Sequence, residues 1–199
     1  MISHKIVGKL RNIAVEVAAW DGSRAEVDLS CICMFTREIG TSSVKGGLAH
    51  VDLALGGNLL GLRKDGVFRA RVGEALLIDE PPSSIAASAL LLIGLGNPVD
   101  WTAETLEAAV HLAANTAFAL KSRSAAFAPG MLDSGLLPDQ TRGAPTHMVK
   151  GLIAAVDAQA RLRELGLTRQ TALERWVFDV GAPRFEDAAM QFGSLLTRK

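Results

Sequence analysis

The order of apolar and polar positions in the first part of the chain has the spacing of β-strands. Residues 13–19 place apolar side chains at every second position, which predicts a half-buried strand. Residues 26–35 begin with the same alternation and then become apolar on both faces, as in a strand that enters the interior of a sheet. The dipeptide Asp21-Gly22 between them is typical of a hairpin turn, so we expect these two strands to pair.

The spacing becomes helical over residues 48–62, where apolar residues recur every three or four positions. Gly66 is well placed to cap the C-terminus of this predicted helix. The pair Gly56-Gly57 lies inside it, and each glycine costs a helix about 1 kcal/mol relative to alanine. We therefore expect another backbone to pack closely against these two glycines.

The remainder of the chain alternates between strand and helix patterns. A short hairpin is predicted at residues 67–71 and 74–79, and residues 86–95 form the most apolar segment, which predicts a central, parallel strand. The predicted elements that follow are a helix capped by Thr102, a strand at 124–130, a helix at 146–165, a strand at 174–181 and a helix opened by Pro183.

This order of elements predicts an α/β fold, a three-layer α/β/α sandwich around a mixed, mainly parallel sheet. No shift in composition marks a linker, so residues 1–199 are expected to form a single domain. At 49% hydrophobic and 21% charged residues, the chain has an ordinary globular balance. It can bury a sizeable core without disulfides or metals.

Charge and targeting signals exclude several classes of partner. Lys and Arg together number 21, as do Asp and Glu, so bulk charge does not favour nucleic-acid binding. No signal peptide and no apolar run of about 20 residues is present, so we expect a cytoplasmic protein without a membrane partner. Cys31 and Cys33 share one face of a strand, which favours reduced core thiols over a disulfide, with a metal pair as the alternative.

The turn Gly94-Leu95-Gly96-Asn97 is the first candidate for a ligand site, because glycine-rich turns after a buried strand often hold phosphate. A dinucleotide-binding fingerprint needs a third glycine, and Val99 occupies its position. We therefore favour a structural corner over a phosphate loop.

Other candidate chemistry is sparse. The histidines have no metal-binding spacing, and no G-x-S-x-G nucleophile motif or paired carboxylates are present. Asp179 ends a predicted strand, where a structural hydrogen bond is the favoured interpretation. We predict no catalytic residue, metal or cofactor.

Three ordered segments resemble the N-terminal domain of the leucyl aminopeptidase family over about residues 47–165. A fourth, Trp101-Thr102-Ala103-Glu104, opens an alanine-rich helix as in that family. The matching residues are Asp52, Ala54, Leu55, Gly56, Gly57, Leu59 and Leu62, then Gly73, Glu74, Leu76 and Leu77, then Leu91, Leu92, Gly94, Leu95 and Gly96.

The resemblance implies a macro-domain-like α/β/α sandwich. The family's metal ligands and catalytic residues belong to a C-terminal domain whose motifs have no counterpart here, so stand-alone peptidase activity is not expected. The segments 40–47 and 127–132 stand where macro domains carry their ligand loops and match them poorly.

Two functions follow from the resemblance. The first is a non-catalytic role in oligomerisation or regulation, with a homo-oligomer or a separately encoded protein as the partner. The alternative is a macro-type module that binds ADP-ribose or another nucleotide at the carboxyl ends of the strands. The candidate ligand-binding residues are Gly94, Gly96, Asn97 and Gly130. A third hypothesis is an enzyme, either a hydrolase that acts on ADP-ribose adducts or a degenerate peptidase, for which we identify no catalytic base.

Overall fold

The computed structural model describes residues 4–20, 22–38, 46–131, 136 and 141–197. These residues form a seven-stranded sheet in the order β1-β2-β7-β6-β3-β5-β4. The strands are β1 (His4–Leu10), β2 (Ile13–Ala18), β3 (Leu29–Met34), β4 (Ala75–Ile78), β5 (Ala89–Gly94), β6 (Ser124–Ala128) and β7 (Arg175–Asp179). The five inner strands run parallel, and β1 and β4 pair antiparallel to their neighbours at the two edges.

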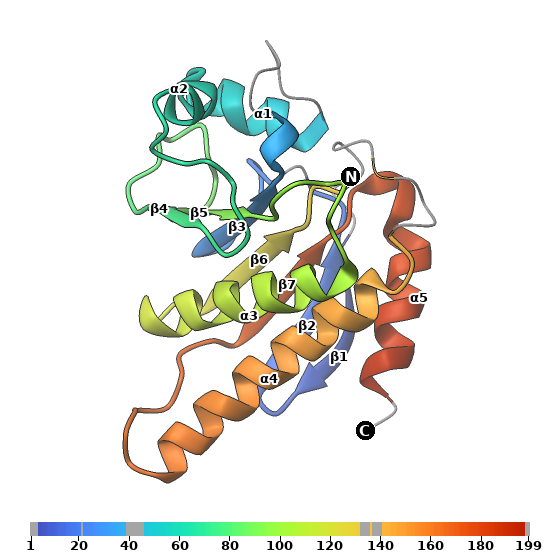
Figure 1. The fold of residues 1–199 in the computed structure, drawn as a ribbon. Coiled ribbons are helices and arrows are strands. Elements are labelled where there is room, and N and C mark those ends of the chain that lie inside the picture. Colours follow the sequence, from blue (N-terminus) through green and yellow to red (C-terminus); the bar gives the residue numbers. More distant parts are fainter. Residues whose placement is uncertain (1–3, 21, 39–45, 132–135, 137–140, 198–199) are drawn as a thin grey trace.

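Helices cover both faces of this sheet, as Figure 1 shows. Helices α3, α4 and α5 pack on one face, and α1 and α2 pack on the other. The helices are α1 (Gly46–Ala54), α2 (Asn58–Lys64), α3 (Ala103–Ala119), α4 (Ala144–Glu164) and α5 (Phe185–Leu196), with 3₁₀ turns η1 (Thr36–Glu38) and η2 (Ala182–Arg184). The predicted three-layer α/β/α fold with a mixed, mainly parallel sheet is confirmed.

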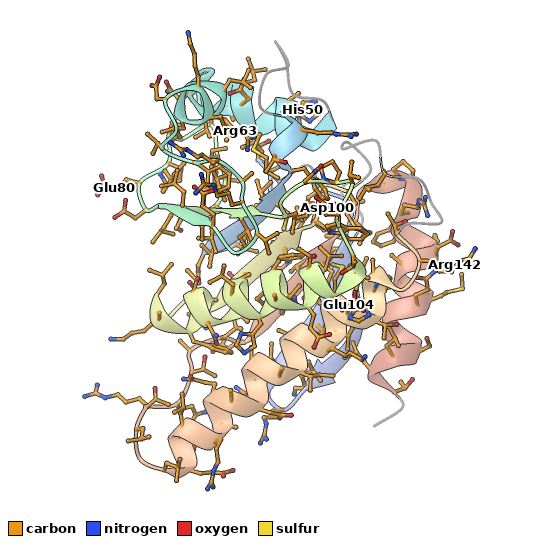
Figure 2. All side chains as sticks on the ribbon, viewed as in Figure 1. His50, Arg63, Glu80, Asp100, Glu104 and Arg142 are labelled. Atoms are coloured by element: carbon orange, nitrogen blue, oxygen red, sulfur yellow. The ribbon has the colours of Figure 1, made fainter. Side chains whose placement is uncertain are left out.

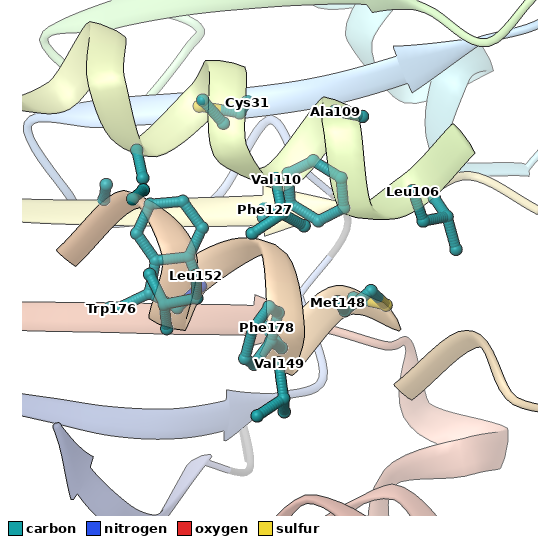
Figure 3. Packing of buried hydrophobic residues seen from close by; sticks show 14 of the residues in the cluster. Cys31, Leu106, Ala109, Val110, Phe127, Met148, Val149, Leu152, Trp176 and Phe178 are labelled. Atoms are coloured by element: carbon teal, nitrogen blue, oxygen red, sulfur yellow. The ribbon is translucent and has the colours of Figure 1, made fainter. Parts of the chain in front are cut away.

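The sheet separates two hydrophobic clusters, and β3 contributes to both. Cys31 and Cys33 point toward the helices α3 and α4, whereas Ile32 and Met34 point toward α1 and α2. Figure 3 shows part of the first cluster, in which Trp176 is fully buried. Both cysteines are buried and no disulfide joins them, so their predicted place in the core is confirmed, whereas their reduced state stays a prediction.

The predicted hairpin between residues 13–19 and 26–35 is wrong. Strand β2 pairs with β1 and β7, and β3 lies between β5 and β6. Because β3 is buried on both faces, two parallel neighbours inside the sheet suit it better than an edge pairing. Asp21 lies outside the described residues.

The lead-in hairpin is instead formed by β1 and β2 around the turn Arg11-Asn12, where Arg11 has φ of 53°. The sequence pattern missed β1 because this edge strand is mostly exposed and lacks a clear apolar face.

The single helix predicted for residues 48–62 is two helices, α1 and α2. Gly56 and Gly57 separate them, with φ of 67° and 81°. A Cβ at Gly57 would meet nothing within 4 Å, so the expected close backbone is absent there and the glycines serve the left-handed turn. Gly66 caps α2 as predicted, with φ of 72° and its N–H donated to the Arg63 carbonyl.

Two further strand predictions need correction. Residues 67–71 are not a strand, and the second half of the predicted hairpin, β4, pairs with β5 instead. Strand β5 is parallel to β3 as expected, but it is the sixth strand in the sheet order rather than a central one. Its apolar sequence reflects burial by helices on both faces, which does not distinguish a central strand from its neighbours.

Candidate functional site

A cavity of about 750 Å³ opens at the carboxyl ends of β2, β6 and β7. The starts of α1 and α4 and the first turns of α5 complete its wall. Trp20, Met148 and Phe192 supply much of the apolar lining. The carboxyl edge of a mainly parallel sheet is the usual place for a ligand in an open α/β fold, because loops from several strands converge there.

Asp179 organises one side of this cavity. Its carboxylate accepts the backbone N–H of Trp20 at 2.9 Å, of Gly22 at 3.2 Å and of Gly181 at 3.4 Å. Asp179 is the last residue of β7 and is only 5% exposed. The predicted structural role of Asp179 is therefore confirmed, and its effect is to fix the chain that follows β2 against the chain that follows β7.

Glycines form a large share of the cavity wall. Among the described residues, six of the lining positions are glycines: Gly22, Gly46, Gly47, Gly130, Gly143 and Gly181. At Gly143 a Cβ would meet nothing within 4 Å, and at Gly181 only the ring of Pro183 at 4.0 Å. Both have positive φ, at 86° and 73°, so the turn conformation requires glycine and leaves main-chain atoms open to the cavity.

Charged groups of both signs stand at the rim. Arg142 precedes α4 and Arg184 precedes α5, and both side chains are exposed. His50, on α1, also lines the cavity. Figure 2 labels both His50 and Arg142. Asp187 adds a carboxylate on α5. Two guanidinium groups at the rim of an apolar cavity favour a ligand that has an apolar part and an anionic part.

An ion pair between Arg175 and Glu16 lies against the ring of Trp20. The guanidinium group of Arg175 lies 5.4 Å from the centre of the Trp20 ring, and its Nε is 3.0 Å from a carboxylate oxygen of Glu16. Glu16 is buried, and the same carboxylate oxygen also lies 3.5 Å from Nδ1 of His4. The contact between Arg175 and Trp20 fixes the indole that faces the cavity.

The four sequence-predicted ligand residues are not brought together. Gly130 lines the cavity, and a Cβ there would lie 2.9 Å from the carbonyl oxygen of Cys33. Gly94 ends β5, Gly96 and Asn97 follow it, and none of the three lines the cavity. Their part in ligand binding stays a prediction.

The turn at Gly94 has the contacts of a structural corner. A Cβ on Gly94 would collide with the carbonyl oxygen of Arg71, and the N–H of Gly96 donates to the Ala70 carbonyl at 2.9 Å. The Asn97 side chain accepts the N–H of Val99 and donates to Asp100. Each of these polar groups therefore already has a hydrogen-bond partner within the protein.

Sequence reasoning missed Trp20, Arg142 and Arg184 as cavity residues. The rule that ligands bind beyond strand ends applied equally to the chain after β2 and β7, but only the turn after β5 has a glycine pattern that attracts attention. Arg142 stands far from any strand in the sequence, so only the fold brings it to the cavity.

Two negative findings concern the described residues alone. No group of three His, Cys, Asp or Glu side chains within them could hold a metal ion. Within the same residues, no helix has both the length and the apolarity needed to cross a membrane. His147 has a structural contact rather than a metal-binding one. Its Nδ1 lies 2.9 Å from a carboxylate oxygen of Glu107, and this contact joins α4 to α3.

The architecture and the position of the cavity define a macro-domain-like α/β protein. The sequence of residues 37–159 matches the cytosol aminopeptidase family, N-terminal domain. Since the match spans more than half of the chain, the chain belongs to this family. The comparison with curated proteins gave no significant match.

Solved structures with the same fold include a leucine aminopeptidase and several macrodomains. A tomato leucine aminopeptidase mutant, K354E, is 18% identical with a TM-score of 0.67, over 89% of this chain and 35% of that one. This chain thus spans about a third of that protein's length.

In two macrodomain structures, the part that matches this chain is a larger share of the neighbour's own length than in the aminopeptidase. The Oceanobacillus iheyensis macrodomain with ADP is 13% identical with a TM-score of 0.64, over 99% of this chain and 96% of that one. The Trypanosoma brucei macrodomain in complex with ADP is 17% identical with a TM-score of 0.62, over 92% and 68%.

Proposed function

We propose that this chain binds a nucleotide diphosphate of the ADP or ADP-ribose class in the cavity at the carboxyl ends of β2, β6 and β7. The observation that carries this proposal is the cavity itself, with its volume of about 750 Å³ and its six glycines. Pockets of roughly 300–1,000 Å³ suit a ligand of this size. The two macrodomain structures named with ADP support the same class of ligand.

The chemistry of the lining accounts for both parts of such a ligand. Trp20 and Met148 offer an apolar surface for a planar base. The guanidinium groups of Arg142 and Arg184 suit a diphosphate, because their paired N–H donors match the oxygens of a phosphate. The absence of a Cβ at Gly143 and Gly181 allows the ligand to approach the main chain closely.

The test is calorimetric titration of the full chain with ADP and ADP-ribose. We expect saturable binding, and a ligand at about 100 times its Kd should raise the free energy of unfolding by about 2.7 kcal/mol. For a chain of about 200 residues this corresponds to a rise in Tm of roughly 5–10 °C. The double variant R142A/R184A should bind more weakly by about tenfold or more.

The control removes the same charge elsewhere. Arg161 and Arg163 lie exposed in the last turn of α4, away from the cavity, so R161A/R163A should bind as the unsubstituted chain does. Absence of binding at millimolar ADP and ADP-ribose, or an equal loss in both double variants, would contradict the proposal.

A second proposal is a non-catalytic role in self-association or in binding a separately encoded partner. It is favoured by the edge strand β1, where Ile6 is 65% exposed and one side of the strand has no neighbouring strand among the described residues. Edge strands of this kind pair readily with other chains. Light scattering should show a dimer or larger assembly that I6K weakens, and a monomer at high concentration would exclude self-association.

A further inference from the structure

A second hollow, of about 400 Å³, lies beside the C-terminus of α2 and apart from the proposed nucleotide cavity. The two share no lining residue. Its lining consists of Thr36, Arg63, Lys64, Asp65, Gly66, Arg69 and Arg71. Four basic side chains and one acidic side chain thus converge here, in a chain whose total charge is zero.

The basic groups keep their charge available to a ligand. Lys64, Arg69 and Arg71 are exposed, and within the described part of the chain no carboxylate forms an ion pair with any of them. Glu74 lies close, but its carboxylate accepts the backbone N–H groups of Arg69 and Arg71 at 2.9–3.1 Å. The carboxylate therefore holds the backbone of these two arginines in place through hydrogen bonds to their N–H groups.

The floor of the hollow is fixed. Arg63 is only 3% exposed, and its Nη2 donates to the carbonyl oxygens of Phe35 and Thr36 at 3.3 Å and 3.2 Å. Its guanidinium carbon also lies 5.9 Å from the centre of the Phe68 ring. Figure 2 shows Arg63 between α2 and the sheet. A buried charge at this position raises the local potential without being free to move.

Gly66 is necessary to this arrangement for two reasons. Its φ of 72° closes α2, and a Cβ there would lie 3.1 Å from Nη2 of Arg69. The guanidinium group of Arg69 therefore lies directly over the glycine. The carbonyls at the end of α2 accept the N–H groups of Asp65, Gly66, Val67 and Phe68, which reduces their repulsion of an anion.

The geometry points to a second ligand site, in which Lys64, Arg69 and Arg71 bind a phosphate group, either as the free ion or as a small phosphate monoester. The donors are cationic and include two guanidinium forks, which match the oxygens of a tetrahedral dianion. The Thr36 hydroxyl is engaged with the Gly96 carbonyl at 3.2 Å, so the basic side chains provide the recognition. This site is independent of the proposed nucleotide cavity.

The test is an NMR titration of the full chain with inorganic phosphate, at constant ionic strength maintained with sodium chloride. We expect saturable shifts of the amides between Lys64 and Arg71. The variant R69A/R71A should weaken binding by about tenfold or more, whereas R161A/R163A, which removes the same charge at the far end of α4, should not. A parallel titration with glycerol 3-phosphate distinguishes the two sources: the tighter ligand identifies a monoester or the free ion.

Further variants keep the test decisive. If R69A/R71A does not fold, R71K, which keeps the charge and removes the guanidinium fork, should still weaken binding. The variant R142A/R184A should leave phosphate binding at this site unchanged even if it abolishes ADP binding. No saturable shift beyond that of chloride, or an equal loss in R69A/R71A and R161A/R163A, would overturn the proposal.

Discussion

The carboxylate of Asp179 and the backbone N–H of Trp20 are 2.9 Å apart, although the two residues are separated by 159 positions in the sequence. This hydrogen bond joins the end of β7 to the chain that leaves β2. It therefore connects two of the strands whose carboxyl ends form the proposed nucleotide cavity. The same carboxylate also receives the N–H of Gly22, so the cavity wall depends on a single buried side chain.

Replacing Asp179 by Asn should destabilise the chain by about 1–3 kcal/mol, because the new amide cannot accept all three backbone N–H groups with the strength of a carboxylate. Urea unfolding measures this loss. The control is Asp157→Asn, which removes an exposed ion pair with Arg11 and should cost at most about 1 kcal/mol. Equal losses in the two variants would exclude a special role for Asp179.

Replacing Gly94 by Ala should destabilise the fold by about 2 kcal/mol or more, because the new methyl group collides with the backbone of Ala70 and Arg71. The matched control is Gly61→Ala inside α2, where nothing lies within 4 Å of the added Cβ. That substitution should raise stability by about 0.5–1 kcal/mol. Thermal unfolding of both variants checks the pair, and a neutral Gly94→Ala would contradict the corner geometry.

Stability should depend on pH through Glu74. Partial burial would raise the pKa of Glu74, but hydrogen bonds from the backbone N–H groups of Arg71 and Arg69 outweigh it and hold that pKa below its ordinary value of 4.5. The stabilisation is then complete above pH 4.5 and is lost as the pH falls through the lowered folded value. Glu74→Gln should destabilise the chain at pH 7 and match the unsubstituted chain at low pH, as measured by urea unfolding at both.

Cys31 and Cys33 should resist alkylation in the folded chain. Burial raises the pKa of the Cys31 thiol far above its ordinary value, and both sulfurs lie in the core, so the reactive thiolate is scarce and shielded. Mass spectrometry after iodoacetamide treatment should find both thiols unmodified in buffer and both modified in denaturant. Rapid modification in buffer would show that β3 is less protected than the structure indicates.

Strongly periodic or strongly apolar segments made most of the fold predictable. The apolar stripe of α3 and the apolar run of β5 identified their elements, since one face of α3 is buried and β5 is buried along nearly its whole length. Strand β1 was not predicted from the sequence, because an exposed edge strand has no apolar face to detect. The pairing of β3 was not predicted because a turn signal is local, whereas the residues that pair with β3 in β5 and β6 lie 60 and 96 positions further along the chain.

The candidate site was less predictable than the fold. Gly130 was found because it follows a strand, and Gly94 was selected for a pattern that serves a close backbone contact. Arg142 and Arg184 precede helices and have no local signal that separates them from other surface arginines. Their position at one cavity depends on how α4 and α5 pack against the sheet, which no short stretch of sequence encodes.

The most direct measurement is an NMR titration of the isotope-labelled chain with ADP-ribose, mapped onto the structure. The account predicts saturable shifts of the Trp20 indole and of the amides around Gly130, Gly143 and Gly181, all on the wall of one cavity. Absence of any saturable shift at millimolar ligand, or shifts confined to another surface, would contradict it.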